Sequence, residues 1–303
     1  MLSGIYSLIS AAFFMVMDAV DVAFTEAAVG AGISTLLILS TLAATTRFQR
    51  ASEHKSILII LLVTITTVLL LYGTVDMPIV GSASAPIHQF VAPHYINDSM
   101  AEIGIPNIVT SVLASYRSYD TLGEVTVIFT AGIGVLTLLL QFNQSSQQID
   151  ENTPAPMQQH LVLRIISKSI IPLILLFALY VQFHGDYGPG GGFQAGIIFA
   201  SGFILYSMIF GLSAAHQVIS PIVLRILSSL GLLLYGSIGL VSLLNDGSFL
   251  NYSVLLNNSI QGQHLGILLI ELGVGITVSS VMIMIFFTFT GRLLTTGTST
   301  NEL

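Results

Sequence analysis

The sequence has 303 residues, of which 53% are hydrophobic and 8% are charged. A typical soluble protein contains about 25% charged residues, so this composition indicates a polytopic membrane protein. The absence of cysteine excludes disulfides, thiol chemistry and cysteine-based metal sites. The 15 acidic residues outnumber the 8 Lys and Arg residues, giving a formal net charge of −7, and leave no basic patch for nucleic acid.

Eight apolar stretches approach the length of about 20 residues that a helix needs to cross the hydrocarbon core. They lie near residues 2–20, 25–46, 56–75, 122–142, 165–184, 192–213, 221–244 and 264–290. We therefore expect an all-α polytopic membrane protein with about eight transmembrane helices in two helical domains. The first stretch is short and ends on acidic residues. The last is longer than a span requires, so we expect it to tilt or to extend beyond the membrane.

The Lys and Arg residues predict the orientation, because cytoplasmic loops are enriched in them. With eight spans and a cytoplasmic N-terminus, Arg117 is the only one on the outer side. The others fall on the cytoplasmic side: Arg47, Arg50, Lys55, Arg164, Lys168, Arg225 and Arg292. We therefore expect a multi-pass protein of the cell (inner) membrane with both chain ends in the cytoplasm.

Two polar stretches divide the chain. Residues 143–163 are rich in Gln, Asn and Ser and contain two prolines, which predicts a cytoplasmic linker. This linker would separate a membrane domain at 1–142 from a second one at 164–303. Residues 76–107 contain four prolines and predict an external loop.

Residues 184–193 read His-Gly-Asp-Tyr-Gly-Pro-Gly-Gly-Gly-Phe and lie between two long apolar runs. Non-helical backbone within a membrane is tolerated only against protein or a water-filled cavity, and ionisable groups there mark a pathway. The alternative is a plain turn at the membrane surface. The pathway interpretation makes His184 and Asp186 candidates for ion or proton transfer.

The glycines of this motif permit positive φ and close backbone approach. We assign that role to Gly185, Gly190, Gly191 and Gly192, and Pro189 belongs to the same structural motif as a turn residue. No Lys-Ser or Lys-Thr pair follows the glycines, which excludes a nucleotide phosphate loop. One His and one Asp make a poor zinc site, and we expect neither a metal site nor a cofactor.

Asp21 and Glu26 open the second apolar stretch. Glu26 has no cation nearby in the sequence. It is either a surface carboxylate at a helix N-terminus, where the macrodipole favours it, or a functional group. Ala28 and Gly32 are four residues apart, a spacing that lets another helix approach closely.

Arg117, Asp120 and Glu124 are spaced by three and four residues, which puts them on one face of a helix. In one interpretation Asp120 caps the helix and pairs with Arg117. In the other, Glu124 carries a proton or cation, because a carboxylate in a low-dielectric site can change protonation near neutral pH. Arg117 is then expected to be a buried counter-charge.

Glu271 follows His264 by seven residues, or two helical turns, so both face the same side about 10 Å apart. A lone carboxylate at that depth should face a partner helix or a wet cavity. The alternative is a neutral glutamic acid that is hydrogen-bonded inside the bundle.

Three stretches resemble parts of Mrp-type multi-subunit cation/proton antiporters. Residues 21–32 resemble the MbhD-like domain of the large A-type subunit, with Val20 where the family usually has proline. Residues 107–142 resemble the MbhE-like domain that follows it, with Ser118 in place of glycine. Residues 160–290 resemble the B-type, MnhB-like subunit, whose signature is His-Gly-His-x-x-Pro-Gly-Gly-Gly-Phe. Asp186 replaces the second His of that signature.

The resemblance implies a membrane subunit that exchanges Na⁺ for protons together with large antiporter-like and small membrane subunits. This chain lacks the large discontinuous-helix domain of the family, so it should not transport alone. In the family a further helix precedes the MbhD-like region, and we expect it to be missing here. The candidate ion and proton stations are Glu26, Glu124, His184, Asp186 and Glu271, with supporting charges at Asp21, Arg117, Asp120 and His264.

Two other functions stay open. The same modules occur in redox-driven complexes such as membrane-bound hydrogenases, where this chain would handle ions while other subunits transfer electrons. It could also be a structural scaffold for proton-pumping partners. A free-standing enzyme is not expected, because no constellation of nucleophile, base and orienting group is present.

Overall fold

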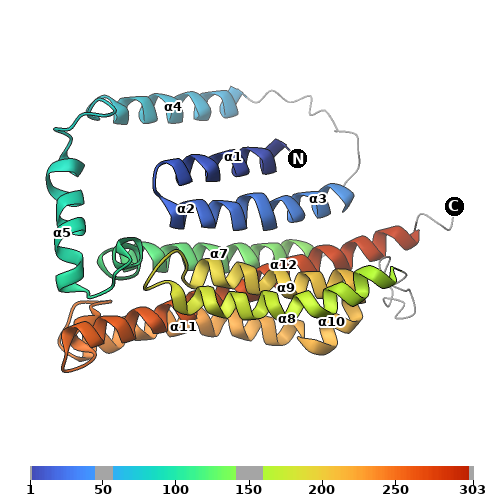
Figure 1. Ribbon diagram of the computed structural model, residues 1–303. Coiled ribbons are helices and arrows are strands. Elements are labelled where there is room, and N and C mark those ends of the chain that lie inside the picture. Colours follow the sequence, from blue (N-terminus) through green and yellow to red (C-terminus); the bar gives the residue numbers. More distant parts are fainter. Residues whose placement is uncertain (1, 45–56, 141–159, 300–303) are drawn as a thin grey trace. The chain divides into compact units, whose positions relative to one another are not determined.

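The computed structural model describes residues 2–44, 57–140 and 160–299, and all regular structure within these ranges is helical (Figure 1). The chain divides into two compact units, one of residues 1–44 and 99–303 and the other of residues 45–98. Within the described ranges, 7 helices are long and apolar enough to cross a membrane. The predicted fold class, an all-α multi-pass membrane protein, is confirmed.

The N-terminal helix of the larger unit is shorter than a membrane span. Helix α1 (Leu2–Val16) has 15 residues, whereas a span requires about 20. It is followed at Asp18 by a left-handed residue, with φ of 60°. The other seven predicted stretches each overlap a helix that satisfies the length and hydropathy of a span.

The second span contains a π-helical segment. It consists of α2 (Val20–Thr25), the π-helix η1 (Glu26–Ser34) and α3 (Thr35–Ala44). The close approach between α1 and this span occurs at Gly30, where a Cβ atom would lie 2.5 Å from Ser7 Oγ. A Cβ at Gly32 would meet only a carbonyl of its own segment, so within the described residues no other helix makes the expected close approach at Gly32. The wider π turn changes which residues share a face.

Helix α12 (Ser259–Ser299) is the centre of the larger unit and packs against α11, α9, α7 and α3. Of its most apolar 18-residue window 72% is buried, compared with 11% for α8. It has 41 residues, or about 60 Å of helix, twice the hydrocarbon thickness of about 30 Å. The prediction of an overlong last span is confirmed.

The remaining elements of the larger unit are α6 (Ile108–Thr110), η3 (Ser111–Tyr116), α7 (Ser118–Leu140), α8 (Leu161–His184), α9 (Gly192–Phe210), α10 (Leu212–Val218), α11 (Pro221–Leu244) and η5 (Tyr252–Val254).

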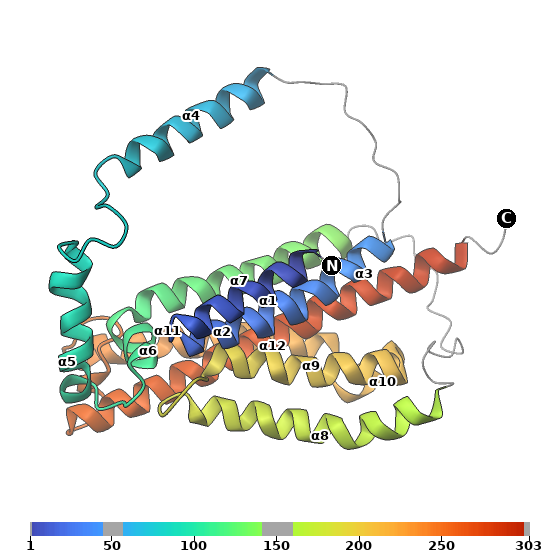
Figure 2. The same ribbon diagram turned by 45° about the horizontal axis from the view of Figure 1, so that its top comes forward.

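Helices α8 and α9 form an antiparallel hairpin joined by the glycine-rich loop, residues 185–191 (Figure 2). Gly191 has a φ of 110°, a conformation that side chains rarely adopt. A Cβ atom at Gly192 would overlap the carbonyl oxygen of Glu271. The glycines therefore let the start of α9 touch the backbone of α12.

The smaller unit contains α4 (Ile57–Thr74), the π-helix η2 (Ile87–Val91) and the beginning of α5 (Ala92–Glu102). The expected loop at 76–107 is thus partly helical. Pro86 starts this helical segment, where no N–H is needed. Pro93 lies just after the π-helix η2 in the interior of the segment, where it removes one regular helix hydrogen bond. Helix α4 is apolar and has no buried residue. Arg47, Arg50, Lys55 and most of the expected linker lie outside the described residues.

Candidate functional site

Two polar side chains from the first half of the chain hold the glycine-rich loop in place by hydrogen bonds. Gly190 N–H donates to Asp21 Oδ1 at 3.1 Å, and Asp21 is only 9% exposed. Asn107 Nδ2 donates to the carbonyl oxygens of Gly185 and Gly188 at 3.1 and 3.0 Å, and to Asp21 Oδ2 at 3.4 Å. Asn107 also caps α6 by accepting from Val109 N–H. One residue therefore holds both a helix start and the loop.

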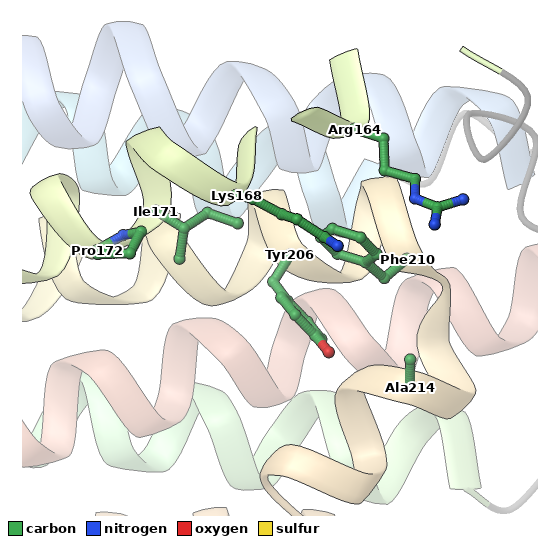
Figure 3. Close-up of a pocket in the computed structure, with 7 residues that line it drawn as sticks. All are labelled: Arg164, Lys168, Ile171, Pro172, Tyr206, Phe210 and Ala214. Carbon is green, nitrogen blue, oxygen red and sulfur yellow. The ribbon is translucent and has the colours of Figure 1, made fainter. Parts of the chain in front are cut away.

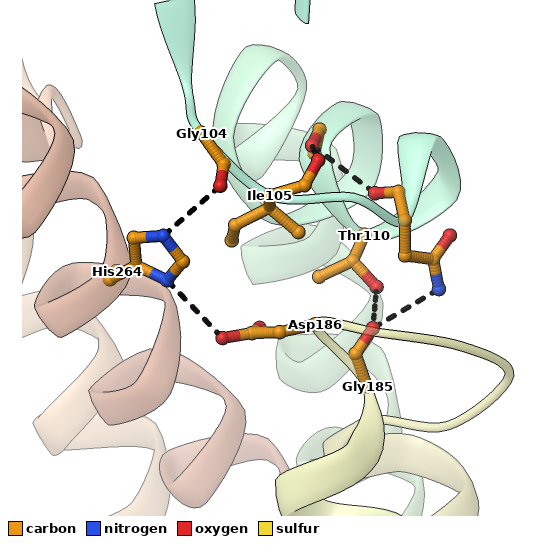
Figure 4. Close-up of polar contacts among 8 residues, drawn as sticks. Gly104, Ile105, Thr110, Gly185, Asp186 and His264 are labelled. Carbon is orange, nitrogen blue, oxygen red and sulfur yellow. Dashed lines mark hydrogen bonds and ion pairs between the residues drawn. The ribbon is translucent and has the colours of Figure 1, made fainter. Parts of the chain in front are cut away.

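A second set of contacts fixes the entry of the loop (Figure 4). Thr110 Oγ1 donates to the carbonyl oxygen of Gly185 at 2.7 Å. The backbone N–H of Asn107 donates to the carbonyl oxygen of Asp186 at 3.1 Å. Segments that are far apart in the sequence thus meet at one short loop.

His264 of α12 lies between two acceptors, as Figure 4 shows. Its Nδ1 is 3.5 Å from Asp186 Oδ2, and its Nε2 is 3.2 Å from the carbonyl oxygen of Gly104. The side chains of His264 and Asp186 are 35% and 21% exposed. The contact with Asp186 is an ion pair only when the imidazole is protonated. It links the loop to α12.

A cavity of about 160 Å³ lies beside the loop and contains two of the predicted carboxylates. Glu124 of α7 and Glu271 of α12 both line it, although they are 147 positions apart in the sequence. The other polar groups are the hydroxyls of Thr25, Thr110 and Thr121 and the amide of Gln194. Gln194 Nε2 donates to Thr25 Oγ1 at 2.7 Å, which leaves the Gln194 carbonyl oxygen as an acceptor.

Glu271 is a partly buried carboxylate against loop backbone. A Cβ atom at Gly185 or Gly191 would lie 3.3 or 3.0 Å from its oxygens. Among the described residues its carboxylate has no hydrogen bond or ion pair, and the nearby charges acting on it are the acids Asp186 and Asp21. Glu124 is the more exposed of the two glutamates. The cavity thus offers oxygen atoms and no cation.

The other three predicted stations, Glu26, His184 and Asp186, do not line this cavity. A carboxylate oxygen of Glu26 lies near Gly30, where α1 packs. His184 stacks on Tyr180 with ring centroids 4.9 Å apart. It lines a separate groove of about 500 Å³ beside residues of α1 and α2.

The expectation that Arg117 is a buried counter-charge is wrong within this chain. Its side chain is 61% exposed and lies 2.6 Å from Asp120 Oδ2. Arg117 has φ of −118° and ends η3, so it is not on the same helix as Asp120 and Glu124. The break between η3 and α7 turns the guanidinium toward the surface of the chain.

The sequence alone did not identify the uncharged polar side chains of the site. Asn107, Thr110, Thr25 and Gln194 fasten the loop or line the cavity. The only sequence signal for any of them was that Asn107 begins the stretch that resembles the MbhE-like domain. Threonine and glutamine are too common to stand out without the fold. No cluster of three potential metal ligands occurs in the described part of the chain.

Family models match most of the chain in three pieces. Residues 162–284 match a domain related to the MnhB subunit of Na⁺/H⁺ antiporters, residues 1–47 match the D subunit of MBH (MbhD), and residues 57–160 match the E subunit of MBH (MbhE). A Staphylococcus aureus protein named as putative antiporter subunit mnhB2 is 33% identical over 137 residues, which cover 96% of that protein and 44% of this chain. The chain belongs to the MnhB family of antiporter subunits. The recognition drawn from the sequence motifs is confirmed.

A second relative of this MnhB family member is much longer than the matched region. This protein of Rhizobium meliloti, named as the probable A/B subunit of a K⁺/H⁺ antiporter, is 28% identical over 145 residues. The match covers 41% of this chain but only 14% of that protein. The chain therefore spans a small part of the length of this relative.

Two solved structures share the fold. A chain of the Mrp complex from Dietzia sp. DQ12-45-1b superposes with a TM-score of 0.71 at 24% identity, covering 95% of this chain and 31% of that one. A chain of the membrane-bound sulfane sulfur reductase, an archaeal respiratory membrane complex, superposes with a TM-score of 0.54 at 26% identity. That match covers 77% of this chain and 96% of the other.

Proposed function

We propose that this protein is a subunit of an Mrp-type complex in the cell membrane that exchanges Na⁺ for protons. It would be part of a secondary transporter and not an enzyme, working with large antiporter-like subunits and small membrane subunits. The MnhB family membership and the likeness to a chain of an Mrp complex support this assignment. Both chain ends would face the cytoplasm, as the Lys and Arg distribution predicts.

The cavity between Glu124 and Glu271 is the proposed segment of the ion path. The observation that carries this proposal is the carboxylate of Glu271, which has no partner in the described residues and shares a cavity with Glu124. An unpaired carboxylate in such a place is stabilised either by a proton or by a cation. Threonine hydroxyls and the Gln194 carbonyl oxygen would supply further ligands to Na⁺, so proton and cation would compete for one site.

The three matched regions would act together at this cavity. We propose a division into membrane domains at 1–142 and 164–303 joined by a cytoplasmic linker at 143–163. Glu124 belongs to the first domain and Glu271 to the second. Asp21, Asn107 and Thr110 of the first domain bind the loop of the second. The ion path would therefore run along the contact between the two domains. Glu26, His184 and Asp186 would be further stations outside this cavity.

The test is exchange by the whole complex in vesicles, followed by the fluorescence of an internal pH dye after Na⁺ addition. We expect Glu271→Gln to reduce exchange to background, because glutamine can neither take up the proton nor neutralise the cation. Glu124→Gln should reduce exchange less, because Glu124 is more exposed. The matched control is Asp246→Asn, which removes an exposed carboxylate at a left-handed turn position that asparagine tolerates.

Full exchange by both glutamine variants in an assembled complex would contradict the ion path. That result would identify the chain as a structural scaffold for proton-pumping partners. Loss of assembly in Glu271→Gln, detected by subunit composition after purification, would equally assign Glu271 a structural role.

A second function is favoured by the likeness to the sulfane sulfur reductase chain, of which this chain covers 96%. In such a complex this protein would handle ions while other subunits transfer electrons. Purification of the tagged chain in mild detergent separates the two functions. Antiporter-like subunits without metalloproteins support exchange, whereas co-purifying iron–sulfur or nickel–iron subunits support the redox-driven complex.

A further inference from the structure

A second cavity lies at the end of the α8–α9 hairpin opposite the glycine-rich loop. It has a volume of about 600 Å³ and lies between Arg164 and Lys168 of α8 and Tyr206 and Phe210 of α9 (Figure 3). Lys168 is 16 residues before His184, or about 24 Å along the helix. This cavity shares no lining residue with the one that contains Glu124 and Glu271.

The charge of this cavity is positive and unbalanced. Arg164 and Lys168 are four residues apart, so both project from one face of α8. No acidic residue of the described ranges lines the cavity. Within the described residues neither cation forms an ion pair with a carboxylate. Two such charges at the end of a membrane helix favour an anionic ligand.

The walls of the cavity are apolar and aromatic. Lys168 Nζ lies over the Phe210 ring, 6.0 Å from its centroid, and Figure 3 shows the Arg164 guanidinium extending beyond it. Pro172 and the Tyr206 ring complete the wall. On the same helix Ile165 and Leu173 are 57% and 63% exposed. The cationic groups are thus continuous with an apolar helix surface.

We propose that this cavity binds the headgroup of an anionic phospholipid. Arg164 and Lys168 would contact the phosphate, and the acyl chains would lie along the exposed face of α8. Basic pockets between transmembrane helices suit such headgroups, and the volume falls within the range of about 300–1,000 Å³ found for small-molecule sites. An inorganic phosphate would satisfy the charges but would leave the adjoining apolar surface uncovered.

The experiment is native mass spectrometry of the full chain after incubation with phosphatidylglycerol or phosphatidylcholine. The Arg164→Gln/Lys168→Gln double variant should bind phosphatidylglycerol about 30-fold more weakly, since each basic group near a membrane surface contributes about fivefold to affinity. Phosphatidylcholine binding should not change. Arg225→Gln is the matched control, because Arg225 is an exposed cation on α11 outside the cavity. A Lys168→Arg variant should keep phosphatidylglycerol binding, which separates loss of charge from misfolding.

Three results would overturn the proposal. The first is unchanged phosphatidylglycerol binding in the double variant, and the second is an equal loss in Arg225→Gln, which would reflect general surface charge. The third is displacement of the lipid by inorganic phosphate at equal concentration, which would indicate a free anion as the ligand. In the whole complex, loss of a partner protein from the double variant with lipid binding intact would assign the cavity to a protein contact instead.

Discussion

The two ends of the α8–α9 hairpin carry cavities of opposite chemistry. At the loop end, a space of about 160 Å³ contains Glu124 and Glu271 and no cation. At the other end, a space of about 600 Å³ contains Arg164 and Lys168 and no acid among the described residues. The first is bounded by backbone that hydrogen bonds hold in place, and the second by side chains on α8, α9 and α10. The small, fixed cavity suits a bare or partly hydrated ion, whereas the large, open one suits a headgroup.

The difference also concerns how each site is assembled. Arg164 and Lys168 are placed together by one turn of a single helix. Glu124 and Glu271 meet only because α7 packs against α12. Disturbing the packing of α12 should therefore damage the carboxylate cavity and leave the cationic one intact.

The largest expected contrast concerns transport. In vesicles of one lipid composition, Glu271→Gln should stop Na⁺/H⁺ exchange by the complex, whereas Arg164→Gln/Lys168→Gln should retain most of it. The reason is that only the carboxylate cavity can exchange a proton for a cation. Comparable loss in both variants, measured with the same pH dye and equal amounts of complex, would remove the proposed division of roles.

Gly192→Ala should destabilise the purified chain by about 3 kcal/mol, because the new methyl group would overlap the Glu271 carbonyl in a contact that overpacking disrupts. Thermal unfolding in detergent measures the effect. Gly134→Ala is the matched control, since nothing lies within 4 Å of the position that its methyl group would take on α7. That change should be neutral or stabilising by up to about 1 kcal/mol. Equal melting temperatures for the two variants would mean that α9 and α12 can separate easily.

Asp21→Asn should loosen the glycine-rich loop by about 1 kcal/mol, because the Gly190 N–H would lose a charged acceptor and keep a neutral one. Hydrogen–deuterium exchange of residues 185–191 should become faster. Asp18→Asn is the control, since Asp18 is an exposed neighbour whose left-handed backbone asparagine also adopts. Unchanged exchange of the loop in Asp21→Asn would show that Asn107 and Thr110 hold it without the Asp21 carboxylate.

The smallest effect is expected at His216 of α10, which follows the α8–α9 hairpin at the end opposite the glycine-rich loop. Burial lowers the pKa of His216 below the ordinary histidine value, and its Nε2 is buried without a partner while the ring contacts Phe287. The contribution of the neutral His216 imidazole to stability is then fully present above the unfolded-state pKa of about 6.5. This contribution is lost as the pH falls below that value, because the unfolded chain takes up the proton first.

Between pH 7.5 and 5.5 this proton uptake should lower the melting temperature by about 2 °C. His216→Phe should remove that part of the pH dependence, whereas His160→Gln, at an exposed histidine, should leave it unchanged. An identical pH profile for His216→Phe and the unmodified chain would contradict the assignment.

By itself the sequence determined the membrane class, the position of seven spans and the MnhB family. These are local properties, since span length and a ten-residue signature do not depend on how helices pack. It also identified Glu124 and Glu271 as unusual carboxylates, because charge within an apolar run is rare.

Only the tertiary structure decided which of the candidate residues lie together. The π-helix at 26–34 changes which residues share a face, so the spacing of Ala28 and Gly32 did not predict their neighbours. The break at Arg117 between η3 and α7 likewise separates Arg117 from the helix that carries Glu124. Asn107 and Thr110 contact the loop across more than 70 positions of sequence. Such contacts depend on the rotation of each helix about its own axis, which packing against α12 fixes and the local sequence does not.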